Sequence, residues 1–240
     1  MKLLTSHGVG PTGAAPKWGA MPSRLTRRGL LALAAASAAA PGALAAPVRP
    51  APIRRVSILG DSIAVGFGLP AGQALPARLQ AELARLGVPA RVTPAGRVGD
   101  TTAGGLRRLD RAAPAGTDLV VVALGGNDLL LGAEPREVRA NLDAIVRRLK
   151  ARGVRVVLAG VRAPPLLSGA WASAFDEAFA SVARTHRVTF VPDMLAGVAL
   201  NPRLNQRDGI HPNAAGVEVI ARRLAPSVAK ALMAGRGAAG

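Results

Sequence analysis

Short apolar runs alternate with longer helical patterns along this chain, and no other feature of the sequence constrains the fold as much. Such alternation is typical of repeated βαβ units around a parallel sheet. Most of the runs are rich in valine or other apolar residues, as strands buried on both faces tend to be. The five predicted strands are Val56–Leu59, Arg91–Thr93, Leu119–Leu124, Val154–Ala159 and Val188–Val191.

Helical patterns fill the gaps between these runs. Leucines recur every four residues from Leu75 to Leu83, and an apolar stripe with helical spacing runs from Val138 to Leu149. A further stripe includes Phe175, and a last helix is expected to begin near Asn213, with Pro226 bending or ending it. We therefore expect an α/β fold: a three-layer α/β/α, flavodoxin-like arrangement with a five-stranded parallel sheet of order 2-1-3-4-5.

Three segments that contain glycine, two of them with a polar side chain as well, follow the first three predicted strands. Gly60-Asp61-Ser62 follows the first, Gly99 lies just after the second, and Gly125-Gly126-Asn127 follows the third. In an open parallel sheet, ligands bind beyond the carboxyl ends of the strands where the strand order reverses. We expect Ser62, Gly99 and Asn127 to stand side by side at that edge.

A serine, a histidine and an aspartate form a candidate catalytic set. The hydroxyl of Ser62 is a poor nucleophile unless a neutral imidazole takes its proton, and a carboxylate must hold that imidazole. Asp208 and His211 are three residues apart on one loop bounded by glycine and proline, so a single turn can present both side chains to the same point. Asn127 and the N–H of Gly99 are candidate donors to an oxyanion.

Four blocks of sequence carry these residues in a fixed order. They read Gly-Asp-Ser-Ile-Ala-Val-Gly-Phe-Gly, Val-Gly-Asp-Thr, Gly-Gly-Asn-Asp and Asp-Gly-Ile-His-Pro. Together they resemble the SGNH-hydrolase, or GDSL-esterase, family over about Arg54 to Leu232. The resemblance is closest to its secreted thioesterase I, lysophospholipase L1 and arylesterase branch.

The resemblance implies a Ser-His-Asp triad of Ser62, His211 and Asp208. It also implies an oxyanion hole made by Ser62, Gly99 and Asn127, and a last loop that folds back across the sheet edge to bring His211 near Ser62. The expected activity is hydrolysis of carboxylic esters or thioesters of small molecules, such as a lysophospholipid, an aryl ester or an acyl thioester. No cofactor is expected.

Few other side chains are candidates for the same roles. Asp193 is an alternative acid but lies 18 residues from His211. His186, at the end of a helical pattern, is interpreted as a helix-end cation. Asp61 and Asp128 are expected to brace their turns through backbone hydrogen bonds.

Several apolar residues on loops are candidates for an acyl-binding groove, although they could equally cap the edge of the sheet. They are Leu129, Leu130, Leu166 and Leu167. These loops carry few aromatic and polar side chains, so an acyl substrate is favoured over a carbohydrate acetyl ester. A carbohydrate O-acetylesterase and a catalytically silent polysaccharide-binding relative remain the alternatives. A nucleotide-binding module is disfavoured because Gly60–Gly68 lacks the lysine of a phosphate loop, and no histidine or carboxylate cluster has the spacing of metal ligands.

The first 45 residues have the pattern of an export signal. They contain five basic and no acidic side chains, and the stretch from Gly29 to Ala40 is almost wholly apolar. Arg27-Arg28 resembles a twin-arginine signal, and cleavage is predicted after Ala45. An apolar stretch of about 12 residues is too short for a membrane anchor, which needs about 20. We expect residues 46–240 to form one domain, periplasmic or secreted; cleavage would remove Met1 and Met21, either of which could be the true start.

The chain is strongly basic, with a net charge of +17 that falls to +12 without residues 1–45. Arginine outnumbers lysine 27 to 4, the charges are scattered along helices, and there is no tyrosine to stack on bases. No nucleic-acid partner is therefore expected, whereas weak attraction to anionic membrane surfaces stays open. The oligomeric state is not encoded in any pattern found here.

Overall fold

A computed structural model describes residues 53–234, so the expected export signal at residues 1–45 lies outside the described residues. Five parallel strands form one sheet in the order β2-β1-β3-β4-β5, which confirms the predicted fold class and strand order. The strands are β1 (Arg54–Gly60), β2 (Ala90–Gly96), β3 (Leu119–Ala123), β4 (Arg155–Ala159) and β5 (Thr189–Val191). The predicted domain boundary at residue 46 stays a prediction.

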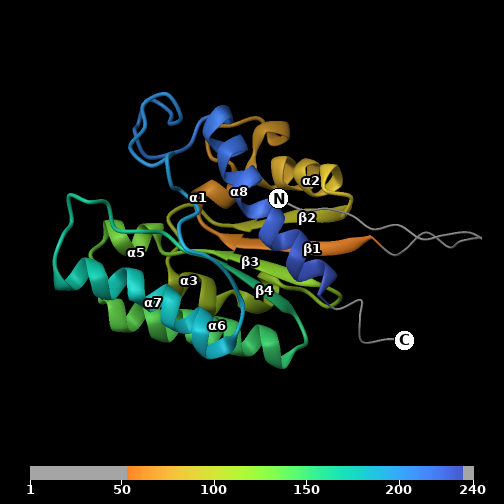
Figure 1. Ribbon diagram of the computed structural model, residues 1–240, viewed down its shortest axis with the longest axis horizontal. Helices are drawn as coiled ribbons and strands as arrows, with labels where there is room; N and C mark the ends of the chain where they lie inside the picture. The colour runs from red at the N-terminus through yellow and green to blue at the C-terminus, as the bar shows by residue number, and fades with distance from the viewer. Residues whose placement is uncertain (1–52, 235–240) are drawn as a thin grey trace, which may run out of the picture. The chain divides into compact units, whose positions relative to one another are not determined.

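Helices cover both faces of this sheet (Figure 1). On one face lie α1 (Ser62–Val65), α2 (Leu75–Arg85) and α8 (Ala214–Met233), with a 3-10 turn at Ala71–Gln73. On the other lie α3 (Thr102–Arg107), α4 (Leu109–Ala112), α6 (Pro135–Ala151) and α7 (Ala170–His186), while α5 (Gly126–Leu130) lies at the carboxyl end of β3. The apolar stripes on α2, α6 and α7 are buried against the sheet, as their spacing predicted.

Strand β2 differs most from its prediction. The predicted strand Arg91–Thr93 is too short, because β2 continues through Pro94 to Gly96. Pro94 lacks a backbone N–H and cannot complete a ladder on both sides, but β2 lies at the edge of the sheet and pairs with β1 alone. The edge position therefore lets the strand extend past the proline.

Helix α8 passes through Pro226, although an end of the helix at this proline was one of the two expected outcomes. It continues from Ala214 to Met233 with Pro226 inside it. A proline removes the hydrogen bond to the carbonyl four residues earlier, here that of Arg222. Both Pro226 and Arg222 are exposed, so water can reach that carbonyl. Pro226 does not end the helix.

The strand register brings the ends of β2, β1 and β3 level. Gly60 at the end of β1 pairs with Gly96 of β2 and with Ala123 of β3. A Cβ atom on Gly60 would lie 2.6 Å from the Cβ of Ala64, and one on Gly96 would lie 2.6 Å from the carbonyl oxygen of Asp61. The two glycines thus let the first turn of α1 pack directly against the strand ends. Within residues 53–234, no helix combines the length and apolar character needed to cross a membrane.

Candidate active site

Ser62 is held in the first turn of a very short helix. Asp61 caps α1, and its Oδ1 accepts a hydrogen bond from the N–H of Ile63 at 3.0 Å. The helix stops at Gly66, whose φ of +78° places it in the left-handed region that favours glycine. Ser62 is 7% exposed, so its hydroxyl lies at the end of β1 in a nearly enclosed position.

His211 joins Ser62 to Asp208. The Nε2 atom of His211 lies 3.0 Å from the Oγ of Ser62, and its Nδ1 atom lies 2.7 Å from Oδ2 of Asp208. The other carboxylate oxygen of Asp208 accepts the N–H groups of Ile210 and His211, each at 2.9 Å. The structure therefore brings together the serine, imidazole and carboxylate that the sequence predicted as a set.

The loop that carries His211 is fastened to the chain around Ser62. Within the loop, the N–H of Gln206 donates to the carbonyl of His211 at 2.7 Å. The side-chain amide of Gln206 donates to the carbonyl of Phe67 at 2.8 Å, and the ring of Phe67 lies 4.6 Å from the imidazole of His211, centroid to centroid. Sequence reasoning missed both residues, although Phe67 lies within the quoted block around Ser62. Their contacts hold the imidazole over the serine.

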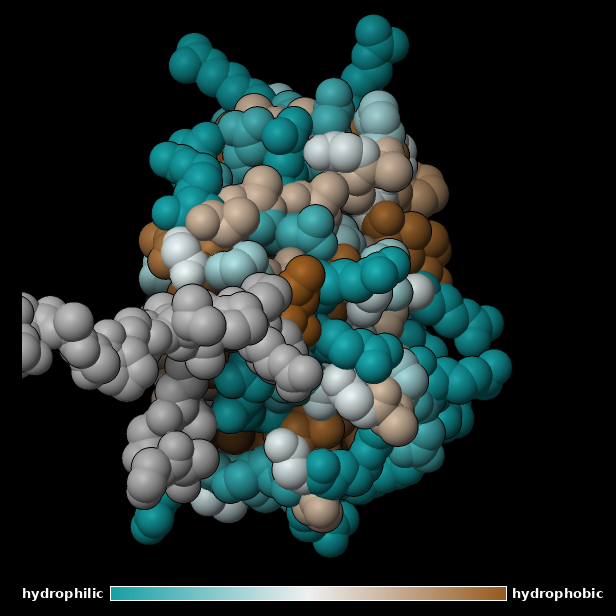
Figure 2. All heavy atoms as spheres, turned by 90° about the vertical axis from the view of Figure 1, so that its right-hand side faces the viewer, coloured by the Kyte–Doolittle hydropathy of each residue, from teal (hydrophilic) through white to brown (hydrophobic). Residues whose placement is uncertain are grey.

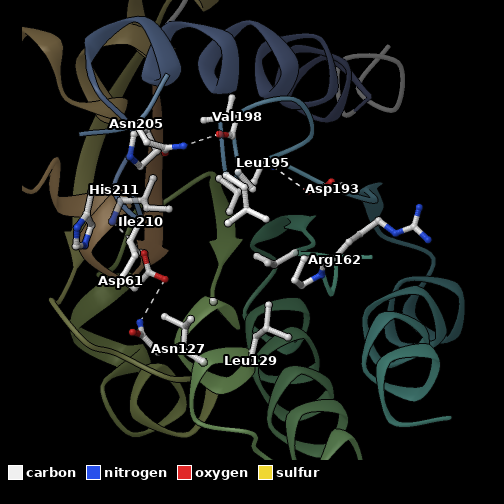
Figure 3. Close-up of a pocket in the computed structure, with 18 of the residues that line it drawn as sticks. Asp61, Asn127, Leu129, Arg162, Asp193, Leu195, Val198, Asn205, Ile210 and His211 are labelled. Carbon is white, nitrogen blue, oxygen red and sulfur yellow. Dashed lines mark hydrogen bonds between the residues drawn. The ribbon is translucent and has the colours of Figure 1, made fainter. Parts of the chain in front are cut away.

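Gly99 and Asn127 lie on the same side of the site. Gly99 has a φ of +73° and lines the pocket that contains Ser62. The amide Nδ2 of Asn127 donates to the carbonyl of Asp100 at 2.8 Å and lies 3.5 Å from Oδ2 of Asp61 (Figure 3). All three predicted oxyanion donors thus border one cavity, as the strand order required.

Asp128 braces these two segments against each other. Its carboxylate is 3% exposed and accepts the N–H of Thr102 at 2.9 Å and the hydroxyl of the same residue at 2.6 Å. Asp61 similarly accepts the N–H of Ile63. The expectation that these two acids brace turns through backbone hydrogen bonds is confirmed.

A partly buried arginine that the sequence did not reveal ties the strand ends together. Arg108 donates to the carboxylate of Asp100 at 2.5 Å, to the carbonyl of Ala95 at 2.6 Å and to the carbonyl of Gly60 at 2.8 Å. Its side chain is 15% exposed and that of Asp100 is 6% exposed. The one available signal was Asp100 itself, in the block Val-Gly-Asp-Thr; nothing in the pattern identifies Arg108 as its partner.

The two acids nearest the histidine have opposite electrostatic environments. Hydrogen bonds from the backbone N–H and the imidazole of His211 lower the pKa of Asp208 to about 2. Burial raises the pKa of Asp61 to about 6, against the smaller opposing effect of its backbone hydrogen bonds. Asp208 is therefore a carboxylate throughout the neutral range, ready to hold the Nδ1–H of His211.

The other candidate side chains take no part in the hydrogen-bond chain of Ser62, His211 and Asp208. Asp193 borders the cavity but accepts the N–H of Leu195 at 2.9 Å. His186 is the last residue of α7, and its Nε2 atom lies 2.6 Å from the carboxylate of Asp143. Among the described residues, no group of three or more histidine, cysteine or acidic side chains could hold a metal ion.

A cavity of about 810 Å³ opens beside Ser62. Its walls are mostly apolar and come from the segments after β3, β4 and β5 and from the loop before α8, with Val161, Pro164, Leu195 and Val198 among them. Arg162 also borders it, but its guanidinium points away from His211 and pairs with Asp176 at 3.0 Å (Figure 3).

The four predicted acyl-binding leucines divide into two pairs. Leu129 and Leu130 line the cavity. The structure does not place Leu166 and Leu167 in its lining; these side chains are 88% and 45% exposed. The neighbouring Pro164 and Pro165 take that part of the wall instead.

Comparison with known proteins decides the family. A sequence model described as the GDSL-like Lipase/Acylhydrolase family matches residues 58–219, which include the serine, the histidine and every other predicted site residue. The chain belongs to this family. It is an ester hydrolase of the GDSL, or SGNH, type.

Similar proteins agree with this assignment. The chain is 39% identical over 156 residues to Esterase TesA of Pseudomonas aeruginosa, which covers 65% of this chain and 78% of that protein. It is 33% identical over 157 residues to Thioesterase 1/protease 1/lysophospholipase L1 of Escherichia coli, covering 65% of this chain and 74% of that protein. The crystal structure of AlinE4, an SGNH-hydrolase family esterase, is 40% identical and covers 77% of this chain and 99% of its own, with a TM-score of 0.64.

Proposed function

We propose that Ser62, His211 and Asp208 are the catalytic triad of this hydrolase. The observation that carries the proposal is the unbroken hydrogen-bond chain from the hydroxyl of Ser62 through both ring nitrogens of His211 to Asp208. Ser62 attacks the ester carbonyl while Nε2 of His211 takes its proton, and the same nitrogen then protonates the leaving group. Asp208 orients the ring and stabilises the imidazolium. Water, activated by His211, releases the acyl group from Ser62.

The negative charge of the tetrahedral intermediate would be held by the N–H groups of Ser62 and Gly99 and by the side-chain amide of Asn127. One hydrogen of that amide already has a partner at 2.8 Å in Asp100, whereas the contact with Asp61 is long, at 3.5 Å. The hydrogen on the side of Asp61 is therefore the one left to donate to the oxyanion. Donors fixed before the reaction need no reorganisation when the charge develops.

The substrate is proposed to be an acyl ester or thioester with a medium or long chain. The cavity beside Ser62 has the volume of a typical small-molecule site and a mainly apolar wall. Leu129 and Leu130 lie in that wall. Similarity to the Escherichia coli thioesterase and lysophospholipase favours the same class.

The enzyme is also proposed to work outside the cytoplasm, after export and cleavage at Ala45. The support for this is the twin-arginine pattern, the short apolar stretch and the Ala43-Leu44-Ala45 sequence.

Hydrolysis of a series of p-nitrophenyl esters from acetyl to dodecanoyl tests the proposed function. We expect turnover to peak at medium or long chains, to vanish in Ser62→Ala, and to be unchanged in Ser173→Ala, which removes an exposed hydroxyl on α7. Turnover limited to the acetyl ester would instead indicate carbohydrate deacetylation. Equal turnover in Ser62→Ala and the unmutated enzyme would contradict the proposed triad.

A further inference from the structure

Large apolar side chains that are more than half exposed lie in the cavity lining or next to it in the sequence. We call the following six residues the apolar rim: Val98 (54% exposed), Leu130 (65%), Leu131 (74%), Leu166 (88%), Leu200 (72%) and Ile210 (57%). Among the other residues that the structure describes, Ile53 alone has a large apolar side chain as exposed as these. Monomeric proteins seldom gather such side chains in one place without a use for them.

The rim residues come from separate segments that the fold brings to one end of the sheet. Val98, Leu130, Leu200 and Ile210 also line the cavity, from the segments after β2, β3 and β5. Leu131 follows Leu130, and Leu166 follows Pro165, which lies in the cavity wall. In Figure 1 these loops project from the left-hand end of the molecule, where the strands finish. The rim therefore lies at the same end of the sheet as the cavity, with four of its residues in the lining and two next to lining residues.

Leu200, one of the rim residues, is exposed although its backbone conformation is unfavourable. Its φ is +61°, in the left-handed region, where a residue other than glycine is strained. That strained conformation leaves the leucine side chain 72% exposed rather than packed in the core. Packing within the described chain does not explain this side chain.

Positive charges lie in the same segments as the rim. Arg97 precedes Val98, and Arg203 and Arg207 lie between Leu200 and Ile210; all three arginines are exposed. Within residues 53–234 none of them forms an ion pair. Of the acids in the last loops, Asp208 is bound to His211 and Asp193 accepts the N–H of Leu195. The rim thus combines apolar side chains with exposed arginines that form no ion pair within the described residues.

We propose that the apolar rim and its arginines dock onto an anionic lipid–water interface. Apolar side chains that enter the interface, flanked by arginines that meet anionic headgroups, are the two features that hold a protein at a membrane surface. Figure 2 shows the opposite end of the molecule, where the visible described residues are a mixture of hydrophilic and hydrophobic ones. Docking by the rim would place the cavity entrance at the lipid. The proposal goes beyond the hydrolytic function and does not depend on it.

Flotation with phosphatidylglycerol vesicles at low ionic strength tests the apolar part of the surface. Every protein is the full chain carrying Ser62→Ala, so that binding is measured without hydrolysis and residues 1–52 are the same throughout. We expect Leu131→Ser with Leu166→Ser to weaken binding on the order of 10- to 100-fold. The matched control removes two exposed apolar side chains at the other end, by Leu86→Ser with Met233→Ser, and should leave binding unchanged. Circular dichroism and thermal unfolding verify that all variants are folded.

The charge contribution is tested with a second matched pair. Arg97→Gln with Arg203→Gln should weaken binding to phosphatidylglycerol vesicles about 10- to 30-fold. The control pair, Arg139→Gln with Arg147→Gln, removes two exposed charges from α6 and should have little effect.

Three results would overturn the docking proposal. The first is no binding of the chain to phosphatidylglycerol vesicles at low ionic strength. The second is equal binding by the rim variants and the matched controls, which would assign any membrane attraction to another part of the chain. The third is dimerisation that the Leu131→Ser and Leu166→Ser changes abolish, without lipid binding, which would make a second copy the partner. Ester hydrolysis by the Ser62-containing enzyme would be unaffected by any of these outcomes.

Discussion

At the scale of single residues, the amide of Asn127 is the group whose loss tests the oxyanion site most cleanly. It borders the cavity from the end of β3, with one hydrogen held by Asp100. We expect Asn127→Ala to lower kcat on the order of 100- to 1,000-fold, because one preorganised oxyanion donor contributes about 2.7 to 4 kcal/mol to lowering the barrier. Steady-state kinetics on a p-nitrophenyl ester measures the change. An unaltered kcat would remove Asn127 from the proposed mechanism.

Asp61 gives a prediction about stability and pH. Burial raises its pKa from the ordinary 3.8 to about 6 in the folded chain. The folded state therefore binds the proton more tightly than the unfolded state, so this stabilising contribution is present below about pH 4 and is lost as the pH rises through about 6. Between about pH 4.5 and 7.5 the loss amounts to about 2 kcal/mol of unfolding free energy.

Asp61→Asn should remove that pH-dependent loss, since the amide keeps an oxygen for the N–H of Ile63 and does not titrate. Urea unfolding of both proteins at the two pH values measures it. We expect the change in unfolding free energy between these pH values to differ by about 2 kcal/mol between enzyme and variant. The same pH dependence in both would show that Asp61 has no raised pKa.

At the scale of elements, Arg108 fixes the ends of β1 and β2 relative to each other. It is the partner of the buried Asp100 and of two strand-end carbonyls. Replacing it with methionine would leave Asp100 as a buried charge without a partner, so we expect the unfolding free energy to fall by about 3 to 5 kcal/mol. The neighbouring Arg107 is exposed, and Arg107→Met should change stability by less than about 0.5 kcal/mol. Chemical denaturation compares the two; equal losses would refute the bracing role of Arg108.

The elements also show how far sequence reasoning reaches. Period and composition predicted the five parallel strands, because buried strands such as β3 are continuous apolar runs. The same signals predicted a β2 that is too short. Pro94 is tolerated in β2 because the strand lies at the edge of the sheet, and that position is a property of the whole sheet. The Arg108 hydrogen bonds join residues up to 48 positions apart, and no local pattern records such a contact.

The site divides in the same way. The strand order alone predicted that Ser62, Gly99 and Asn127 would meet at one edge. The prediction that His211 lies next to Ser62 rested on the family resemblance, because the loop before α8 has no periodic pattern from which its conformation could be predicted. In the structure, contacts of Gln206 and His211 with Phe67 position this loop.

At the scale of the whole molecule, the proposal of export makes a prediction about the mature chain. We expect amino-terminal sequencing of the exported protein to begin at Ala46, because small residues at Ala43 and Ala45 suit a signal peptidase. Changing Arg27 and Arg28 together to lysine should keep the protein inside the cell if the signal is of the twin-arginine type. Export that is unaffected by this change would indicate a different route.

The central claim, that Ser62 is the nucleophile activated by His211 and Asp208, is tested most directly by covalent labelling. The enzyme is treated with diethyl p-nitrophenyl phosphate, which transfers a phosphoryl group to an activated serine, and the modified peptide is identified by mass spectrometry. We expect a single adduct, on Ser62, that forms in proportion to the loss of esterase activity and is much slower to form in His211→Ala. Complete inactivation with Ser62 unmodified, or labelling of Ser62 at the same rate in His211→Ala, would contradict it.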